Sequence, residues 1–305
     1  MILFGRSGDG SADIARLTGT FSAYNDFSTI ESELNFATLE VEGIAGRNVV
    51  AAAEKEYGEG TPTPLVDAVR LPIAILAVAR HSALNLVSHD DTGRKVKADD
   101  NEKMPWEWMI DRDDRAQLDR FYRAMDALFA YLERERPELA APGNECIVKS
   151  IRDFENVYPI DHSLYVFHRM TPLMIEVQRT KLMKRVGADK WAVITGPGPL
   201  SDADAMLLWH CERFAILSAL VLAVRRWSLS VFPLEIARRF APSYQGNKSS
   251  RVATVEEIDR FVNAMRGEID DIANDIIETL TGENPAASAD FIPSGNPKDK
   301  FFSAQ

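Results

Sequence analysis

The chain has 305 residues, of which 46% are hydrophobic and 27% are charged, and its formal net charge is −11. This composition is typical of a globular protein, and the length supports one large core or two cores of about 100 to 150 residues each. The net negative charge argues against a broad basic face that binds nucleic acid. The two cysteines lie far apart and fit no disulfide framework or metal motif, so a reducing, cytoplasmic site of synthesis is expected.

The sequence predicts neither a signal peptide nor a membrane anchor. The N-terminus lacks a basic segment followed by an apolar stretch, which a signal peptide needs. The longest charge-free apolar run, 214–224, is shorter than the roughly 18 to 20 residues that cross a bilayer. We therefore expect this run to form a buried helix and expect no association with a membrane.

Residues 1–29 are predicted to form an N-terminal arm, and residues 30–140 a first helical repeat. In that repeat, a helix over 47–57 should stop at Gly58, and a second should open at Pro64 and continue towards Leu84. Pro72 should kink the second helix or mark its true start, because proline lacks the amide that an interior helical position needs.

The end of the first repeat is predicted to contain a small hairpin and a third helix. The segment 84–88 looks extended, and the turn sequence Asp-Asp-Thr-Gly at 90–93 precedes a second extended piece. The third helix should start with Asp111 as its N-cap and end before Pro137. The interrupted stretch 138–143 is then the natural boundary between the two repeats.

Residues 141–282 are predicted to form the second repeat. Its first helix should open at Pro172 and end at Gly187, and Ser201 with Asp204 resembles a capping box that starts a long helix. An extended piece is expected at 228–232. A capping box at 254–257 should start the last helix, which Gly282 ends.

Residues 283–305 are predicted to form an extended C-terminal tail. The tail is rich in Pro, Ser, Ala and Asn, so it cannot build a core of its own. Its three phenylalanines, Phe291, Phe301 and Phe302, are expected to act as anchors on a neighbouring subunit.

Two collinear pairs of similar segments suggest that the two repeats share an origin. The sequence LAVARHS at 76–82 matches LAVRRWS at 222–228, and DRFYRAM at 119–125 matches DRFVNAM at 259–265, each at five of seven positions. We interpret them as an old duplication of a helical unit. The predicted fold is mainly α, with two tandem copies of a three-helix unit, each with a short extended or hairpin insertion, plus the arm and the tail.

No residue pattern in the chain predicts a catalytic, cofactor-binding or metal site, so we expect no cofactor and no enzymatic activity. His210 and Cys211 are adjacent on a helix, where their side chains point in different directions, and buried core positions explain them best. Asp161, His162 and His168 form the one cluster that supports an alternative class, a soluble all-α enzyme with its site between the repeats.

The two tryptophans in Met-Pro-Trp-Glu-Trp at 104–108 have two interpretations. Trp106 and Trp108 either form an apolar staple across the following helix or make a contact site for another chain. The second interpretation admits a further alternative, in which the protein is a helical scaffold that binds a peptide or a host protein through this region.

Several segments resemble those of a poorly characterised protein family found in tailed bacteriophages and prophages. The resemblance runs through 87–93, 104–106 and 119–132, and continues through Phe154, 158–160, Phe167 and 171–172 to Gly187. It implies a virion structural protein, made in the bacterial host cytoplasm, and the helical character is similar to that of head-to-tail connector (adaptor) proteins. The implied partners are further copies of the chain in a ring, together with the portal or neighbouring neck or tail proteins.

The physical properties of the chain fit a ring around a DNA channel. Head-to-tail contacts between copies close into rings when the rotation allows. An acidic channel lets DNA pass without sequence-specific binding, because like charges cannot release the counterions that drive protein–DNA affinity. We therefore expect an acidic surface towards the channel.

Overall fold

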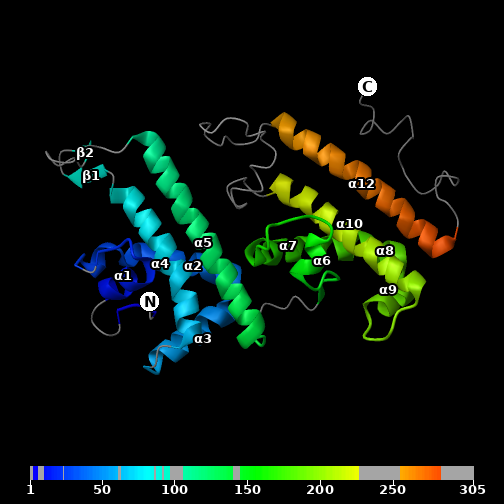
Figure 1. Ribbon diagram of the computed structural model, residues 1–305, viewed down its shortest axis with the longest axis horizontal. Helices are drawn as coiled ribbons and strands as arrows, with labels where there is room; N and C mark the ends of the chain where they lie inside the picture. Colours follow the sequence, from blue (N-terminus) through cyan, green and yellow to red (C-terminus); the bar gives the residue numbers. More distant parts are fainter. Residues whose placement is uncertain are drawn as a thin grey trace. The chain divides into compact units, whose positions relative to one another are not determined.

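The computed structural model describes residues 3–5, 10–22, 24–60, 63–85, 87–90, 93–96, 106–139, 145–226 and 255–282. These residues are mainly α-helical, which confirms the predicted helical class (Figure 1). They form two compact units: unit 1 contains the described residues of 1–143 together with 163–166, and unit 2 contains the others. The division after residue 143 lies at the end of the stretch in which we placed the boundary.

Unit 1 is built from five helices, a short 3-10 helix and a two-stranded hairpin. In chain order these elements are α1 (Gly10–Thr18), η1 (Phe27–Thr29), α2 (Glu31–Ala45), α3 (Arg47–Gly58), α4 (Pro64–Asn85), β1 (Val87–Asp90), β2 (Gly93–Val96) and α5 (Glu107–Glu135). The strands are antiparallel and pair Val87 with Val96 and Asp90 with Gly93, as the turn signal predicts. Residues 84 and 85, expected to be extended, instead form the last turn of α4.

Helix α4 is the centre of unit 1, because it packs against α1, α2, α3 and α5. It begins at Pro64, where the sequence places its start, and continues through Pro72, so Pro72 does not mark a true start. The Thr63 hydroxyl accepts a hydrogen bond from the Val66 amide (3.3 Å) and so caps the first turn. The buried side chains of α4 form the main core of the unit: Leu65, Val66, Val69, Ile73, Ala74 and Ala77.

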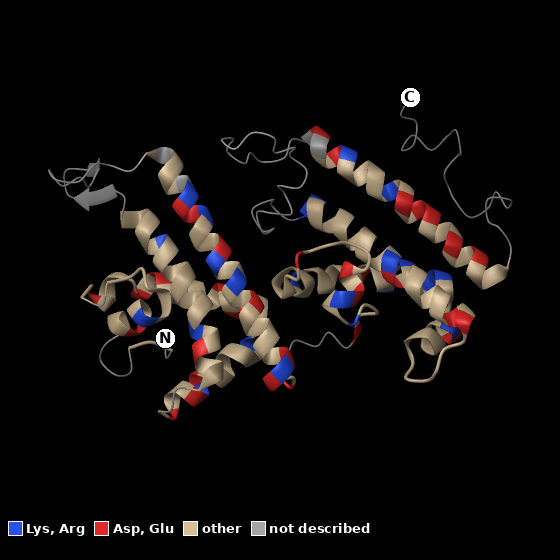
Figure 2. Ribbon diagram, viewed as in Figure 1, with Lys and Arg blue, Asp and Glu red and all other residues tan. Residues whose placement is uncertain are grey.

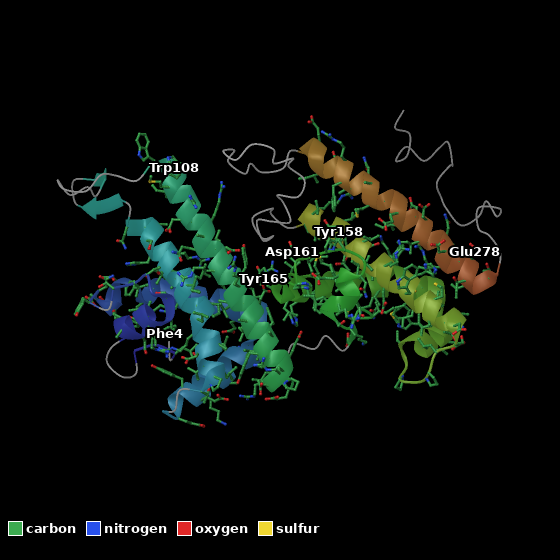
Figure 3. The ribbon with its side chains drawn as sticks, viewed as in Figure 1. Phe4, Trp108, Tyr158, Asp161, Tyr165 and Glu278 are labelled. Atoms are coloured by element: carbon green, nitrogen blue, oxygen red, sulfur yellow. The ribbon has the colours of Figure 1, made fainter. Side chains whose placement is uncertain are left out.

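The predicted N-terminal arm is part of this core. Residues 10–18 form α1, in which Ile14 is fully buried. A partly buried ion pair joins α1 to α4, with Arg70 Nη2 at 2.5 Å from Asp13 Oδ2. The Arg70 guanidinium also lies over the rings of Phe4 (4.8 Å) and Tyr57 (5.1 Å). Phe4 is labelled in Figure 3.

Helix α5 begins earlier than its sequence predicts. It starts at Glu107 with Trp106 as the residue before it, so Asp111 lies inside the helix and is not the N-cap. The predicted end before Pro137 is correct, since the last helical residue is Glu135. The side chains that α5 buries lie three or four residues apart on one face, as in an amphipathic helix: Phe121, Met125, Leu128, Phe129 and Leu132.

Asp126 of α5 holds the start of α7 (Leu164–Val177). Its Oδ1 atom accepts hydrogen bonds from the Ser163 hydroxyl (3.1 Å) and from the Tyr165 amide (2.7 Å). The Ser163 hydroxyl in turn accepts from the Val166 amide (3.3 Å), which is an N-cap contact. Burial raises the pKa of Asp126 above its ordinary value, although both hydrogen bonds lower it.

Unit 2 contains α6 (Ile151–Glu155), which precedes α7, the rest of α7 and the helices that follow α7. The following helices are the π-helix η3 (Gln178–Leu182), α8 (Met183–Val186), α9 (Ala188–Thr195), α10 (Asp202–Arg226) and α12 (Val255–Thr281). The prediction that a helix opens at Pro172 is wrong, because α7 begins at Leu164 and Pro172 lies inside it. The predicted end at Gly187 is correct, since α8 stops at Val186 and Gly187 has a φ of 82°.

The long helices α10 and α12 pack side by side and form the core of unit 2 (Figure 1). Ser201 and Asp204 make the predicted cap of α10, since the Ser201 hydroxyl accepts from the Asp204 amide (3.2 Å) and donates to its carboxylate (2.7 Å). Within the described ranges, α10 has the length and apolarity of a membrane span. However, 61% of its apolar window is buried, as in a core helix.

The two pairs of similar segments occupy corresponding helix pairs. The segment 76–82 lies towards the end of α4, which packs against α5, and 119–125 lies on α5. The segment that begins at 222 lies at the end of α10, which packs against α12, and 259–265 lies on α12. The other described helices differ in number and length between the units, so the tandem three-helix repeat stays a prediction. The predicted extended piece at 228–232 and Thr254 lie outside the described residues.

Candidate functional site

The two tryptophans predicted as contact residues are exposed at the start of α5. Trp106 is 71% exposed and Trp108 is 58% exposed, and the adjacent Met109 is 42% exposed. Trp108 is labelled in Figure 3. An apolar staple would bury these rings, so the staple interpretation is wrong. We call Trp106, Trp108 and Met109 the α5 aromatic patch. The other predicted anchors, Phe291, Phe301 and Phe302, lie outside the described residues.

The cluster that supports the enzyme alternative has a structural explanation. Asp161 and His162 adopt left-handed backbone conformations, with φ values of 55° and 58°. Glu155 holds this turn, because its carboxylate accepts from the amides of Ile160 (3.3 Å) and His162 (2.6 Å). The His162 ring is 91% exposed, with Nδ1 at 2.5 Å from Glu155. His168 packs its ring against Phe167 at 5.7 Å on α7.

A partly buried carboxyl group lies on α10 in unit 2. Burial, together with the smaller effect of the nearby charge of Asp153, raises the pKa of Glu212 to about 7. Asp153 is itself fixed, because it forms a capping box with Ser150 at the start of α6. The folded protein therefore favours the neutral, protonated form of Glu212.

We expect Glu212→Gln to remove a pH-dependent loss of stability. A raised pKa in the folded state means that the neutral carboxyl stabilises the fold below pH 4.5, and that this contribution is lost as the pH rises through about 7. Solvent screening at this partly exposed side chain reduces the effect to about 1–2 kcal/mol. At pH 8 the variant should exceed the wild type by that amount in free energy of unfolding, and at pH 5 most of this difference should disappear.

Urea unfolding of both proteins at pH 5 and pH 8 measures the difference. The exposed Glu256 provides a control, because Glu256→Gln should leave the pH dependence as in the wild type. A Glu212→Gln protein with the same pH dependence as the wild type would contradict the assignment.

Cys211 and His210 are core residues, as predicted, and Cys146 is buried as well. Cys146, Cys211 and His210 are 1%, 0% and 8% exposed, and both thiols are free. Burial raises the pKa of Cys211 to about 12, with a further contribution from Glu212. Burial also lowers the pKa of His210, so its ring is neutral at neutral pH.

Sequence reasoning missed a second exposed apolar pair, on α10. Met206 is 50% exposed and Trp209 is 46% exposed, and their spacing of three residues places them on one face of the helix. The Arg213 guanidinium lies over the Trp209 ring at 4.7 Å and pairs with Glu268 of α12 at 3.0 Å. The His210 ring lies 5.0 Å from the Trp209 ring. The three-residue spacing is the one signal in the sequence that points to this pair.

The C-terminal half of α12 is strongly acidic (Figure 2). Residues 268–278 contain five acidic and no basic side chains: Glu268, Asp270, Asp271, Asp275 and Glu278. Four of them lie three or four residues apart in sequence and therefore share one side of the helix. Glu278 is labelled near the end of α12 in Figure 3.

Within the described ranges, no group of three or more His, Cys, Asp or Glu side chains is placed to hold a metal ion. Comparison with known proteins gives no match to a family model, a curated protein or a solved structure. The candidate interaction surfaces are therefore the exposed aromatic side chains on α5 and α10 and the acidic half of α12.

Proposed function

We propose that the protein is a structural component of a tailed-phage or prophage virion that acts by oligomeric assembly. Its proposed position is a head-to-tail connector or neck ring around the DNA exit channel. The α5 aromatic patch is the observation that carries the proposal. Exposed tryptophans are costly in water, and aromatic residues with methionine are enriched in the cores of protein interfaces. The resemblance of several segments to a phage protein family also supports a role in a virion.

The proposed assembly uses a head-to-tail contact between copies. In such a contact the α5 aromatic patch of one copy meets a different surface on the next, and the rotation closes the ring. The phenylalanines of 283–305 are proposed to add anchors on the neighbour. Portal or neck proteins are the proposed further partners.

The acidity of the chain supports a role beside DNA without binding to it. The net charge of −11 opposes the release of counterions that drives affinity for the phosphate backbone. Packaged DNA would therefore pass such a ring without adhering to it.

Native mass spectrometry and negative-stain imaging of the full chain test the proposal. We expect a defined oligomer or ring, which Trp106→Ser with Trp108→Ser reduces to monomers because the apolar contact is lost. A second variant that lacks 283–305 tests the tail in the same way.

The matched control is Phe36→Ser with Leu39→Ser on α2, since these side chains are 57% and 65% exposed. This variant should keep the oligomer. A wild-type chain that remains monomeric at tens of micromolar would contradict self-assembly. If both double variants weaken the oligomer equally, the α5 aromatic patch is not the specific contact between copies.

A further inference from the structure

An exposed edge of unit 2 combines apolar and acidic side chains. We call it the α10–α12 edge and define it by Met206, Trp209, Asp271, Asp275 and Glu278. Met206 and Trp209 project from α10, and the three carboxylates from the acidic half of α12. About half of each apolar residue is exposed, and Asp271 and Glu278 are exposed as well.

Side-chain contacts join the two parts of this edge. Trp209 stacks on Arg213, which pairs with Glu268 one turn before Asp271. Trp209 also lies against His210, whose Nδ1 is 3.7 Å from Asp275 Oδ2. The two helices run antiparallel, since residue 210 meets 275 while residue 213 meets 268. Met206 therefore lies towards the end of α12 that carries Glu278.

Among the described residues of unit 2, no Lys or Arg forms an ion pair with the carboxylates of the edge. Arg213 pairs with Glu268, but among the described residues no ion pair joins a cation to Asp271 or Glu278. His210 is neutral at neutral pH because burial lowers its pKa, so it does not compensate Asp275. The like charges at 271 and 275 and at 275 and 278 repel each other across one helical turn. Negative charge near a helix C-terminus is also unfavourable.

We propose that the α10–α12 edge binds a cationic amphipathic helix of a partner protein. The apolar side chains of that helix contact Met206 and Trp209, and its Lys or Arg side chains face Asp271, Asp275 and Glu278. Charge complementarity selects this partner: an anionic or purely apolar segment would leave the carboxylates uncompensated. A helix that lays apolar residues three and four positions apart into such an edge is a common mode of peptide recognition. The proposal does not depend on the virion role given above.

The test uses a synthetic Leu–Lys amphipathic peptide of about 14 residues, about four helical turns, with a fluorescent label. Its affinity for the full-length protein is measured by fluorescence anisotropy. A Leu–Glu peptide of the same pattern serves as the peptide control and should not bind. Asp271→Asn with Asp275→Asn and Glu278→Gln should weaken binding of the Leu–Lys peptide about tenfold or more.

A charge-matched control separates this edge from the general acidity of the chain. Glu31→Gln with Glu59→Gln and Asp259→Asn removes three exposed acids elsewhere, and its affinity should stay within about twofold of the wild type. Trp209→Ser should weaken binding about tenfold, provided that its thermal unfolding midpoint matches that of the wild type. Met206→Ser gives the same test at a second position if Trp209→Ser does not fold.

Three outcomes would overturn the proposal. Equal losses in the two triple variants would show non-specific charge attraction. Binding of the Leu–Glu peptide would remove the charge argument. Sedimentation that shows wild-type self-association, lost in the Asp271, Asp275 and Glu278 variant, together with no peptide binding, would assign the edge to a second copy of the chain.

Discussion

Asp13→Asn should lower the free energy of unfolding of unit 1 by about 3 kcal/mol, because it removes the nearer of the two carboxylates that pair with a buried cation. Arg70 is only 2% exposed, and its Nη2 atom lies 2.5 Å from Asp13. The rings of Phe4 and Tyr57 lie over the guanidinium. The second carboxylate, that of Asp67, is 4.0 Å away and 44% exposed, so it compensates the lost charge only in part. Urea unfolding followed by circular dichroism at 222 nm measures the change.

The exposed pair between Arg80 and Glu40 is the matched control. Both side chains are substantially exposed, at 37% and 42%, so Glu40→Gln should cost less than about 1 kcal/mol. If Asp13→Asn and Glu40→Gln lower the stability by the same small amount, burial is not what makes the Arg70 pair important.

Gln178→Leu should lower the stability of unit 2 by about 2–3 kcal/mol. Gln178 is 6% exposed in the π-helix η3, and its side chain holds the chain before α6 at two points. Its Oε1 atom accepts from the Ile147 amide (2.9 Å), and its Nε2 atom donates to the Glu145 carbonyl (2.8 Å). Leucine of similar size leaves the buried amide of Ile147 without an acceptor, which carries a penalty of about 1–3 kcal/mol for that group alone.

Thermal unfolding and amide hydrogen exchange together check this expectation. Exchange at Ile147 should accelerate in Gln178→Leu more than at amides in the middle of α10. Thr180→Ala is the control in the same π-helix, because the exposed Thr180 hydroxyl donates to the Glu176 carbonyl at the end of α7, only four residues earlier (2.7 Å). Its effect should stay below about 0.5 kcal/mol. Unchanged exchange at Ile147 would show that the Gln178 contacts are dispensable.

The helix ends that the sequence predicts correctly are those with local signals. Ser201 reaches Asp204 within one turn, and Pro64 and Gly187 act through their own backbone preferences. Gly282 ends α12 in a left-handed conformation, with a φ of 68°, as predicted. These signals act between neighbours in the sequence, so they can be identified without knowledge of the fold.

The start of α7 could not be predicted in this way because it depends on a distant residue. The N-terminal turn of α7 is held by Ser163 and by Asp126, which lies 37 residues earlier than Ser163 on α5. Pro172 then has to be accommodated inside the helix, although the sequence alone favours it at a first turn. The core position of α1 could not be predicted for the same reason, since α1 packs against α4, which lies about 50 residues later in the chain.

The candidate surfaces were only partly predictable. Trp106 and Trp108 stand out in the sequence, because two tryptophans precede a helix, and both are exposed. Met206 and Trp209 do not stand out, because α10 is apolar along most of its length and reads as a buried helix. Their exposure is decided by which side of α10 the other helices cover, and that is a property of packing.

The buried thiols of unit 2 simplify chemical labelling of this protein. Maleimides and similar reagents attack the thiolate, and burial keeps both Cys146 and Cys211 protonated and out of reach. A cysteine introduced at an exposed site such as Val193, which is 51% exposed, would therefore react alone in the folded chain. Spin labels, dyes or cross-linkers can thus be attached at one chosen surface position without replacement of the native cysteines.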